Sequence, residues 1–149
     1  MTDQPTAPDA GNARHCFVCG PDNPLGMQIA FRIEAGICRG EFTPPEHLCG
    51  FDGVTHGGVL FSLLDDVMAN RLFLQGEPAY TGKCEVRYRQ PAAIGERLLL
   101  EGELMSRKGR VAQLRGRVSR ARDAAVVAEA TATFFVLPPG QAAAPAPSG

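Results

Sequence analysis

The stretch THGGVLFSLLDDVMANRLFL, residues 55–74, decides the fold of this chain. It opens on Gly57 and Gly58, and the apolar run behind them is the longest in the sequence. Apolar residues recur on one broad side of a helical wheel: Leu60, Leu63, Leu64, Val67 and Leu74. We therefore expect one largely buried helix over residues 59–74, which should stop at Gly76.

Two neighbouring acids lie within this run, and the helical period separates them. Asp65 falls beside Phe61 and Met68 at the edge of the apolar arc, whereas Asp66 lies about 100° further round. We expect Asp65 to be half desolvated and Asp66 to face a more polar boundary. The helix N-terminus in front of both offers unpaired N–H groups and a positive dipole end, which suit a polarised oxygen.

Strand-like alternation flanks the helix on both sides. Residues 27–42 predict two strands joined at Gly36, and a loop follows them. Four strands come after the helix with no helix between them: residues 84–89, 98–105, 111–119 and 125–137. Such strands should form an antiparallel meander or something close to it. The predicted fold class is α+β, with a curved antiparallel sheet wrapped round one long central helix.

Length and composition narrow the possible functions. The 149 residues are 44% hydrophobic, which fits one domain with a core, and we assign it to residues 15–137. Residues 1–14 and 138–149 predict disordered tails that bury too little apolar surface to fold. A net charge of -1 and few aromatic residues argue against a nucleic-acid binder. We expect a cytoplasmic protein, because neither a secretory leader nor a membrane span is evident.

The five cysteines are an odd number at irregular spacing, which favours free thiols over a disulfide framework. Cys16 and Cys19 form a CxxC in a loop dense in glycine and proline. Zinc binding is the alternative, but no second CxxC and no closely spaced histidine pair follows. A redox role is disfavoured because the CxxC does not sit at a strand-to-helix junction. The sequence therefore predicts no metal site.

Four pieces of the chain resemble the hotdog fold, and within it the PaaI-like acyl-CoA thioesterases. The first is CFVCGPDNPLG, residues 16–26, and the second is His56-Gly57-Gly58 with Asp65 behind it. The third is Thr81, which opens a strand that ends at Pro91 and Gly95, and the fourth is VAEATATF, residues 127–134. Together they cover about 15–137.

The resemblance implies hydrolysis of an acyl-CoA thioester by a homodimer, possibly doubled into a tetramer, with sheets joined edge to edge. It makes the Gly57 N–H the oxyanion donor and Asp65 the nucleophile or general base, alternatives that stay open. Eight residues of helix separate these two by about 12 Å, so the family pairs the glycine of one subunit with the acid of the other. It also implies that Thr81 lies near the acid. His56 either orients the substrate or holds the loop.

The expected substrate contacts lie on the helix and on a basic turn: Gly58, Phe61, Leu64, Met68, Arg107, Lys108 and Arg110. The basic turn suits the phosphates of coenzyme A. Because coenzyme A belongs to the substrate, no separate cofactor is expected. Relatives often carry a basic residue before the proline of this strand, but here the position is Gln90.

Two other functions remain alternatives. A hotdog hydratase or dehydratase would use a histidine and an acid for proton transfer, and His56 and Asp65 are present, although their spacing fits a thioesterase better. A non-catalytic acyl-CoA binding module would bind without turnover.

Overall fold

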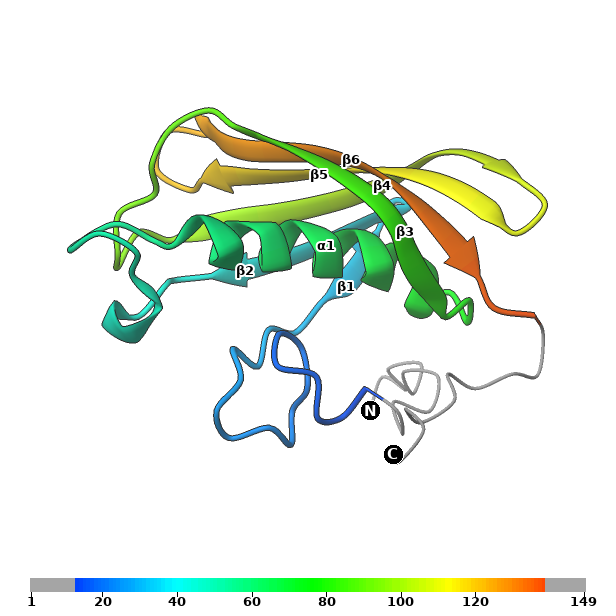
Figure 1. Cartoon of the computed structure of the whole chain (residues 1–149), viewed down its shortest axis with the longest axis horizontal. Coiled ribbons are helices and arrows are strands. Elements are labelled where there is room, and N and C mark those ends of the chain that lie inside the picture. Colours follow the sequence, from blue (N-terminus) through cyan, green and yellow to red (C-terminus); the bar gives the residue numbers. More distant parts are fainter. Residues whose placement is uncertain (1–12, 139–149) are drawn as a thin grey trace.

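The computed structural model describes residues 13–138, and the predicted tails lie outside this range except for residues 13, 14 and 138. One long helix crosses the concave face of a curved six-stranded sheet (Figure 1). The elements in chain order are β1 (Arg32–Glu34), β2 (Ile37–Phe42), the 3₁₀ turn η2 (Glu46–Leu48), α1 (Gly57–Phe73), β3 (Ala79–Tyr88), β4 (Leu98–Lys108), β5 (Val111–Arg120) and β6 (Val126–Val136). The predicted α+β architecture is confirmed. No helix in this part of the chain is long and apolar enough to span a membrane.

The sheet is antiparallel throughout, but its strand order is not a simple meander. The order is β1-β2-β4-β5-β6-β3, so β1 lies beside β2, and β4, β5 and β6 follow one another, but β3 lies beside neither β2 nor β4. Strand β2 already pairs with β4. The chain therefore places β3, which follows the helix, on the far side of β6. This order makes β3 an edge strand.

The core lies between α1 and the sheet. The helix buries one side completely, through Leu60, Leu63, Leu64, Val67, Met68 and Leu72. Close approach needs a gap in the sheet surface, and Gly102 of β4 provides it: a Cβ there would lie 2.4 Å from the Val67 carbonyl oxygen. Burial of this face, at about 25 cal/mol per Å² of apolar surface, is what holds the helix on the sheet.

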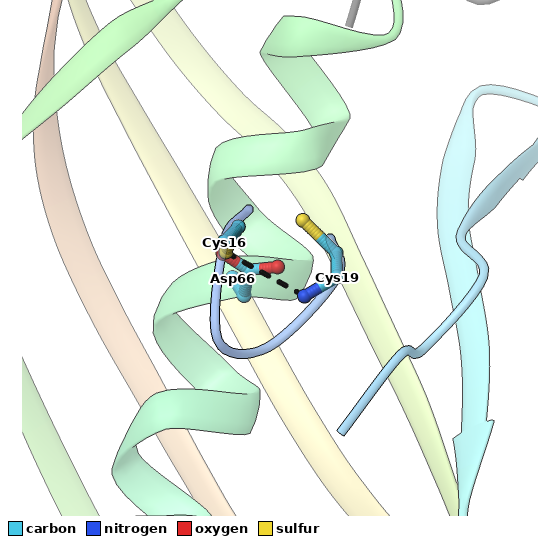
Figure 2. Close-up of side chains that lie close together, drawn as sticks. All are labelled: Cys16, Cys19 and Asp66. Carbon is cyan, nitrogen blue, oxygen red and sulfur yellow. Dashed lines mark hydrogen bonds between the residues drawn. The ribbon is translucent and has the colours of Figure 1, made fainter. Parts of the chain in front are cut away.

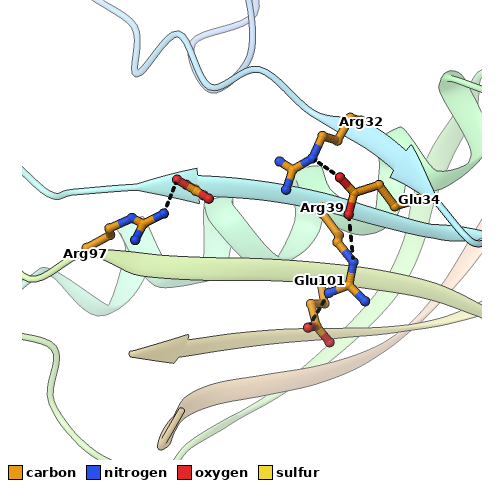
Figure 3. A network of polar contacts seen from close by, with 6 residues as sticks. Arg32, Glu34, Arg39, Arg97 and Glu101 are labelled. Atoms are coloured by element: carbon orange, nitrogen blue, oxygen red, sulfur yellow. Dashed lines mark hydrogen bonds and ion pairs between the residues drawn. The ribbon is translucent and has the colours of Figure 1, made fainter. Parts of the chain in front are cut away.

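The two edges of the sheet differ. Strand β1 has three residues and carries charge: Arg32 pairs with Glu34 at 2.6 Å (Figure 3). The ion pairs continue inward along the same face, where Arg39 Nη1 lies 2.6 Å from Glu101 Oε1. Strand β3 has ten residues and pairs only with β6. Short, charged edges resist strand addition, whereas a long open edge invites it.

Candidate active site

Helix α1 starts at the His-Gly-Gly motif, and His56 caps it. The His56 backbone is extended, with φ −61° and ψ 137°, and its Nδ1 accepts a 2.8 Å hydrogen bond from the Gly58 N–H. Because Nδ1 is the acceptor, the neutral imidazole carries its proton on Nε2. His56 therefore holds the loop, which was one of its two predicted roles. The side chain is exposed, so Nε2–H remains a donor for a ligand.

Gly57, the first helical residue, keeps its N–H available. Within residues 13–138 this N–H meets no acceptor, whereas the Gly57 carbonyl accepts a 3.0 Å hydrogen bond from the Tyr88 hydroxyl. A Cβ at Gly57 would contact Tyr88 at an ordinary 3.7 Å, but at Gly58 it would come within 3.1 Å of His56 Nδ1. Packing among the described residues thus accounts for the glycine at position 58 and gives no reason for the one at position 57.

Asp65 faces strand β3, where the Thr81 hydroxyl donates a 2.7 Å hydrogen bond to its Oδ1. A β-bulge aims Thr81: the pairing with β6 shifts between Thr81 and Lys83 and leaves Gly82 unpaired. A Cβ at Gly82 would fall 2.1 Å from the Phe135 ring, so a larger residue there would have to displace that ring. The second carboxylate oxygen, Oδ2, accepts no hydrogen bond within the described residues.

A cysteine next to this pair is chemically inert. Burial, together with the nearby charge of Asp65, raises the pKa of Cys84 to about 11. The thiol is therefore neutral near pH 7, and a neutral thiol is a poor nucleophile. The group beside Thr81 that can act as a base or nucleophile is the Asp65 carboxylate.

The expected difference in burial between the two acids is wrong. Burial raises the pKa of Asp66 to about 7, and charge on Cys16 adds to the effect. The helical wheel correctly placed Asp66 away from the apolar arc. However, the loop that carries Cys16 and Cys19 covers that side of the helix (Figure 2), which a wheel does not represent. Asp66 is consequently the more desolvated acid.

Gly57 and Asp65 do not meet within the chain. Both lie on the same uninterrupted helix, which runs from Gly57 to Phe73. Eight residues at 1.5 Å each separate their backbones by about 12 Å along the axis. The structure therefore forms two partial sites: His56, Gly57 and Tyr88 at the helix start, and Asp65 with Thr81 near its middle.

The remaining predicted contacts fall in different places. Phe61 is 38% exposed on the open side of the helix. Leu64 and Met68 are fully buried beneath the sheet, so they belong to the core and line no open pocket in the described part of the chain. Arg107 forms an ion pair with Glu77, just beyond the C-terminal end of α1. Its β4–β5 hairpin projects past the end of the helix opposite to Gly57 (Figure 1).

Two cavities flank these elements. One, of about 300 Å³ and mostly apolar, opens between the N-terminal loop and the first turn of α1, with Phe17, Leu25 and Val59 in its wall. The other, of about 340 Å³, is lined mainly by arginines and glutamates of β3, β5 and β6, Glu129 among them, and by Arg89, which directly follows β3. Those two residues form an ion pair with each other.

Sequence reasoning missed two residues at the helix start. Tyr88 was predicted only as an alternating strand residue, although it bonds Gly57, because the pattern does not say how β3 crosses the helix. Thr55, one residue before His56, is 4% exposed, and its hydroxyl has no hydrogen-bond partner in residues 13–138. Neither residue carries a motif signal.

Solved structures share this fold. A crystal structure described as a thioesterase superfamily protein is 32% identical, with a TM-score of 0.76, and the match covers 82% of this chain and 63% of that one. A hypothetical thioesterase from Streptococcus pneumoniae with coenzyme A is 19% identical, with a TM-score of 0.68, over 72% and 87% of the two chains. The Escherichia coli PaaI protein is 18% identical, with a TM-score of 0.69, over 75% and 81%.

The present chain thus spans less than two thirds of the length of the first of these relatives. No curated protein matches the sequence significantly. The sequence model of the thioesterase superfamily matches residues 52–127, which include all of α1, β3, β4 and β5. With the one-helix, six-stranded fold and the structural relatives in agreement, this match shows that the chain belongs to the thioesterase superfamily.

Proposed function

We propose that this protein is an acyl-CoA thioesterase that hydrolyses its substrate to a free acid and coenzyme A. The observation that carries the proposal is the 2.7 Å hydrogen bond from Thr81 to Asp65. Asp65 lies on the same helix as Gly57, whose backbone N–H is available for a ligand. Thioester hydrolysis needs a donor for the developing oxyanion and a base or nucleophile aimed at the carbonyl carbon. These two partial sites contain the required groups.

The 12 Å separation of Gly57 and Asp65 makes a second chain part of the mechanism. The open edge of β3 is the surface for it, since this strand carries Thr81 and has no neighbour on its outer side. Pairing of two β3 edges would bring each Asp65 and Thr81 toward the helix of the other chain. We therefore propose a homodimer in which Gly57 of one subunit and Asp65 of the other act on one thioester.

Within such a site each group has a defined task. The Gly57 N–H donates to the carbonyl oxygen and stabilises the negative charge that develops there. Thr81 holds Oδ1 of Asp65, which leaves Oδ2 to attack the carbonyl carbon or to take a proton from water. Tyr88 fixes the first turn through the Gly57 carbonyl. His56 Nε2–H is available to the sulfur of the leaving coenzyme A.

Relatives support the choice of substrate and residues. The Streptococcus pneumoniae protein was solved with coenzyme A, and a Streptococcus mutans protein with acetyl-CoA. Two variants of the pneumococcal protein were also solved. One replaces an aspartate by alanine, and the other replaces by alanine a threonine that lies 16 positions after that aspartate. The same interval separates Asp65 and Thr81.

The coenzyme A end of the substrate is assigned to the basic turn. Arg107 is engaged by Glu77, whereas Lys108 and Arg110 are exposed and form no ion pair within the described residues. Those two are therefore the better partners for the phosphates. Because the hairpin lies at the far end of the helix from Gly57, this contact would also cross between subunits.

The test is hydrolysis of a panel of acyl-CoA thioesters followed with a thiol reagent. Wild type should release free thiol, and Asp65→Asn should lose nearly all turnover. Asp123→Asn, an exposed acid paired with Arg120, is the matched control and should turn over normally. Turnover of Asp65→Asn at the wild-type rate would refute the assignment. Hydration of crotonyl-CoA without thiol release would instead identify a hydratase, and tight binding without turnover a binding module.

A further inference from the structure

The N-terminal loop and the helix bring together three side chains of the types that bind metal ions. Cys16 and Cys19 come from the loop, and Asp66 comes from α1, 50 residues further along the chain than Cys16 (Figure 2). One ligand atom from each lies within 4.8 Å of the other two. The Cys16 Sγ to Asp66 Oδ1 distance is 3.8 Å. This cluster is separate from the proposed active site, because its carboxylate is Asp66 and not the Asp65 that bonds Thr81.

The loop holds the two sulfurs in place through its backbone. The Gly20 N–H donates to the Cys16 carbonyl at 2.8 Å, and the Cys19 N–H points at Cys16 Sγ at 3.5 Å. A Cβ at Gly20 would lie 2.4 Å from the Cys16 nitrogen, so this tight turn requires glycine. The loop backbone therefore fixes the positions of the two thiols without a bound ligand.

The charges within the cluster are unbalanced. A hydrogen bond from Cys19 lowers the pKa of Cys16 to about 5, and that same bond, together with burial, raises the pKa of Cys19. Burial raises the pKa of Asp66 to about 7. Asp66 forms no ion pair within residues 13–138, and its neighbour Asp65 is another acid. Two thiols and a carboxyl group gathered in this way form a donor set that suits a divalent metal ion.

We propose that Cys16, Cys19 and Asp66 bind one zinc ion. Two thiolates and a carboxylate favour zinc over magnesium or calcium, which prefer oxygen ligands. With Zn–S near 2.3 Å and Zn–O near 2.0–2.2 Å, tetrahedral geometry puts ligand atoms roughly 3.5–3.8 Å apart. The 3.8 Å between Cys16 Sγ and Asp66 Oδ1 already meets this spacing. A water molecule completes the fourth position, because the two cysteines are partly exposed.

A neighbouring amide orients these ligands. Asn70, one turn after Asp66 and only 7% exposed, donates from Nδ2 to Asp66 Oδ2 at 3.1 Å and points toward Cys19 Sγ at 3.8 Å. Hydrogen bonds of this kind to metal ligands fix their orientation. Asparagine is unusual on the buried side of a helix, and this contact gives it a reason.

The ion would fasten the loop to the helix. The loop is otherwise held by burial of Val18 and Ile29 and by weak sulfur contacts with α1. Phe17, between the two cysteines, forms part of the wall of the apolar cavity near the start of α1. A bound ion would therefore fix one wall of that cavity.

Metal analysis of the full chain tests the proposal. Protein purified under reducing conditions and loaded with Zn²⁺ should hold one ion per chain after desalting. Co²⁺ in its place should give the visible absorption of a tetrahedral site and a thiolate-to-cobalt charge-transfer band. Cys16→Ser and Cys19→Ser should lose the ion. Cys49→Ser, a partly buried cysteine outside the cluster, is the matched control and should keep it.

Two measurements keep the test decisive if a cysteine variant fails to fold. Asp66→Asn should weaken zinc affinity at least ~10-fold, the smallest effect expected even for a group outside the ligand shell. In wild type, zinc should protect two thiols from alkylation until a chelator is added. The proposal is overturned if wild type binds less than stoichiometric metal or if Asp66→Asn binds zinc as tightly as wild type. A Cys16–Cys19 disulfide in protein prepared without oxidant also overturns it.

Discussion

Replacing Gly57 by proline would remove the proposed oxyanion donor with little disturbance of the fold. Proline lacks the N–H, and its fixed φ suits the first position of a helix. The residue before a proline must be extended, and His56 already has φ −61° and ψ 137°. The lost N–H makes no hydrogen bond within residues 13–138, so no contact inside the described protomer is lost.

The expected effect is large on catalysis and small on stability. Loss of one oxyanion donor lowers kcat roughly 100- to 1000-fold, or about 2.7–4 kcal/mol of transition-state stabilisation. Proline at a compatible position instead stabilises a protein by about 0.4–1 kcal/mol, because the unfolded chain has fewer conformations. Activity and stability should therefore change in opposite directions.

Steady-state kinetics on the preferred acyl-CoA, together with thermal unfolding, would measure both effects. Gly57→Ala is the control, since it keeps the N–H and its Cβ would meet only Tyr88, at 3.7 Å. We expect Gly57→Ala to retain much more activity than Gly57→Pro. A folded Gly57→Pro enzyme with kcat within a few-fold of wild type, or equal losses in the two variants, would refute the oxyanion role.

Mixing two inactive variants then tests the location of the site. If Gly57 and Asp65 come from different subunits, a heterodimer of Gly57→Pro and Asp65→Asn chains has one intact site. Random assortment should restore about a quarter of wild-type activity, because about half of the dimers are mixed and each has one of two sites. If both groups acted from one chain, mixing would restore nothing.

Three further outcomes are expected. Thr81→Val should lower kcat/KM roughly 10- to 150-fold in the thiol-release assay, because a hydrogen bond to a charged group contributes about 1.5–3 kcal/mol. Thr81→Ser, which keeps the hydroxyl, should keep most of the activity. Gly102→Ala should destabilise the protein by about 1–3 kcal/mol in urea unfolding, because its Cβ would press on the Val67 carbonyl. Zinc affinity, measured by competition with a chelator, should rise with pH both below and above 7, since the ion must displace a proton from Asp66 and from Cys19, whose pKa the hydrogen bond with Cys16 and burial both raise; a flat profile would contradict this.

Local pattern was sufficient for most of the fold. Helix α1 and the six strands follow from the switch between periods of 3.6 and two, which reports side-chain direction along a single segment. The order of the strands in the sheet could not be predicted from local pattern. The position of β3 beyond β6 depends on which edges β2 has already occupied, and period alone does not contain that information.

The site was predicted unevenly for the same reason. Spacing along one helix correctly separated Gly57 from Asp65. Thr81, 16 residues after Asp65, does lie beside it and donates a hydrogen bond to its carboxylate. Leu64 and Met68 are expected among the substrate contacts, yet the sheet covers them. Amphipathic pattern identifies an apolar face without identifying what packs on it.

The sequence by itself determined the elements and the axial distance between Gly57 and Asp65 on the helix, because each depends on neighbours within a few turns of chain. Only the tertiary structure decided that Tyr88 reaches Gly57 and that Cys16 and Cys19 meet Asp66. These contacts join segments 31 and 50 residues apart. Their formation depends on how strands and loop cross the helix, which burial and sheet register fix for the whole chain at once.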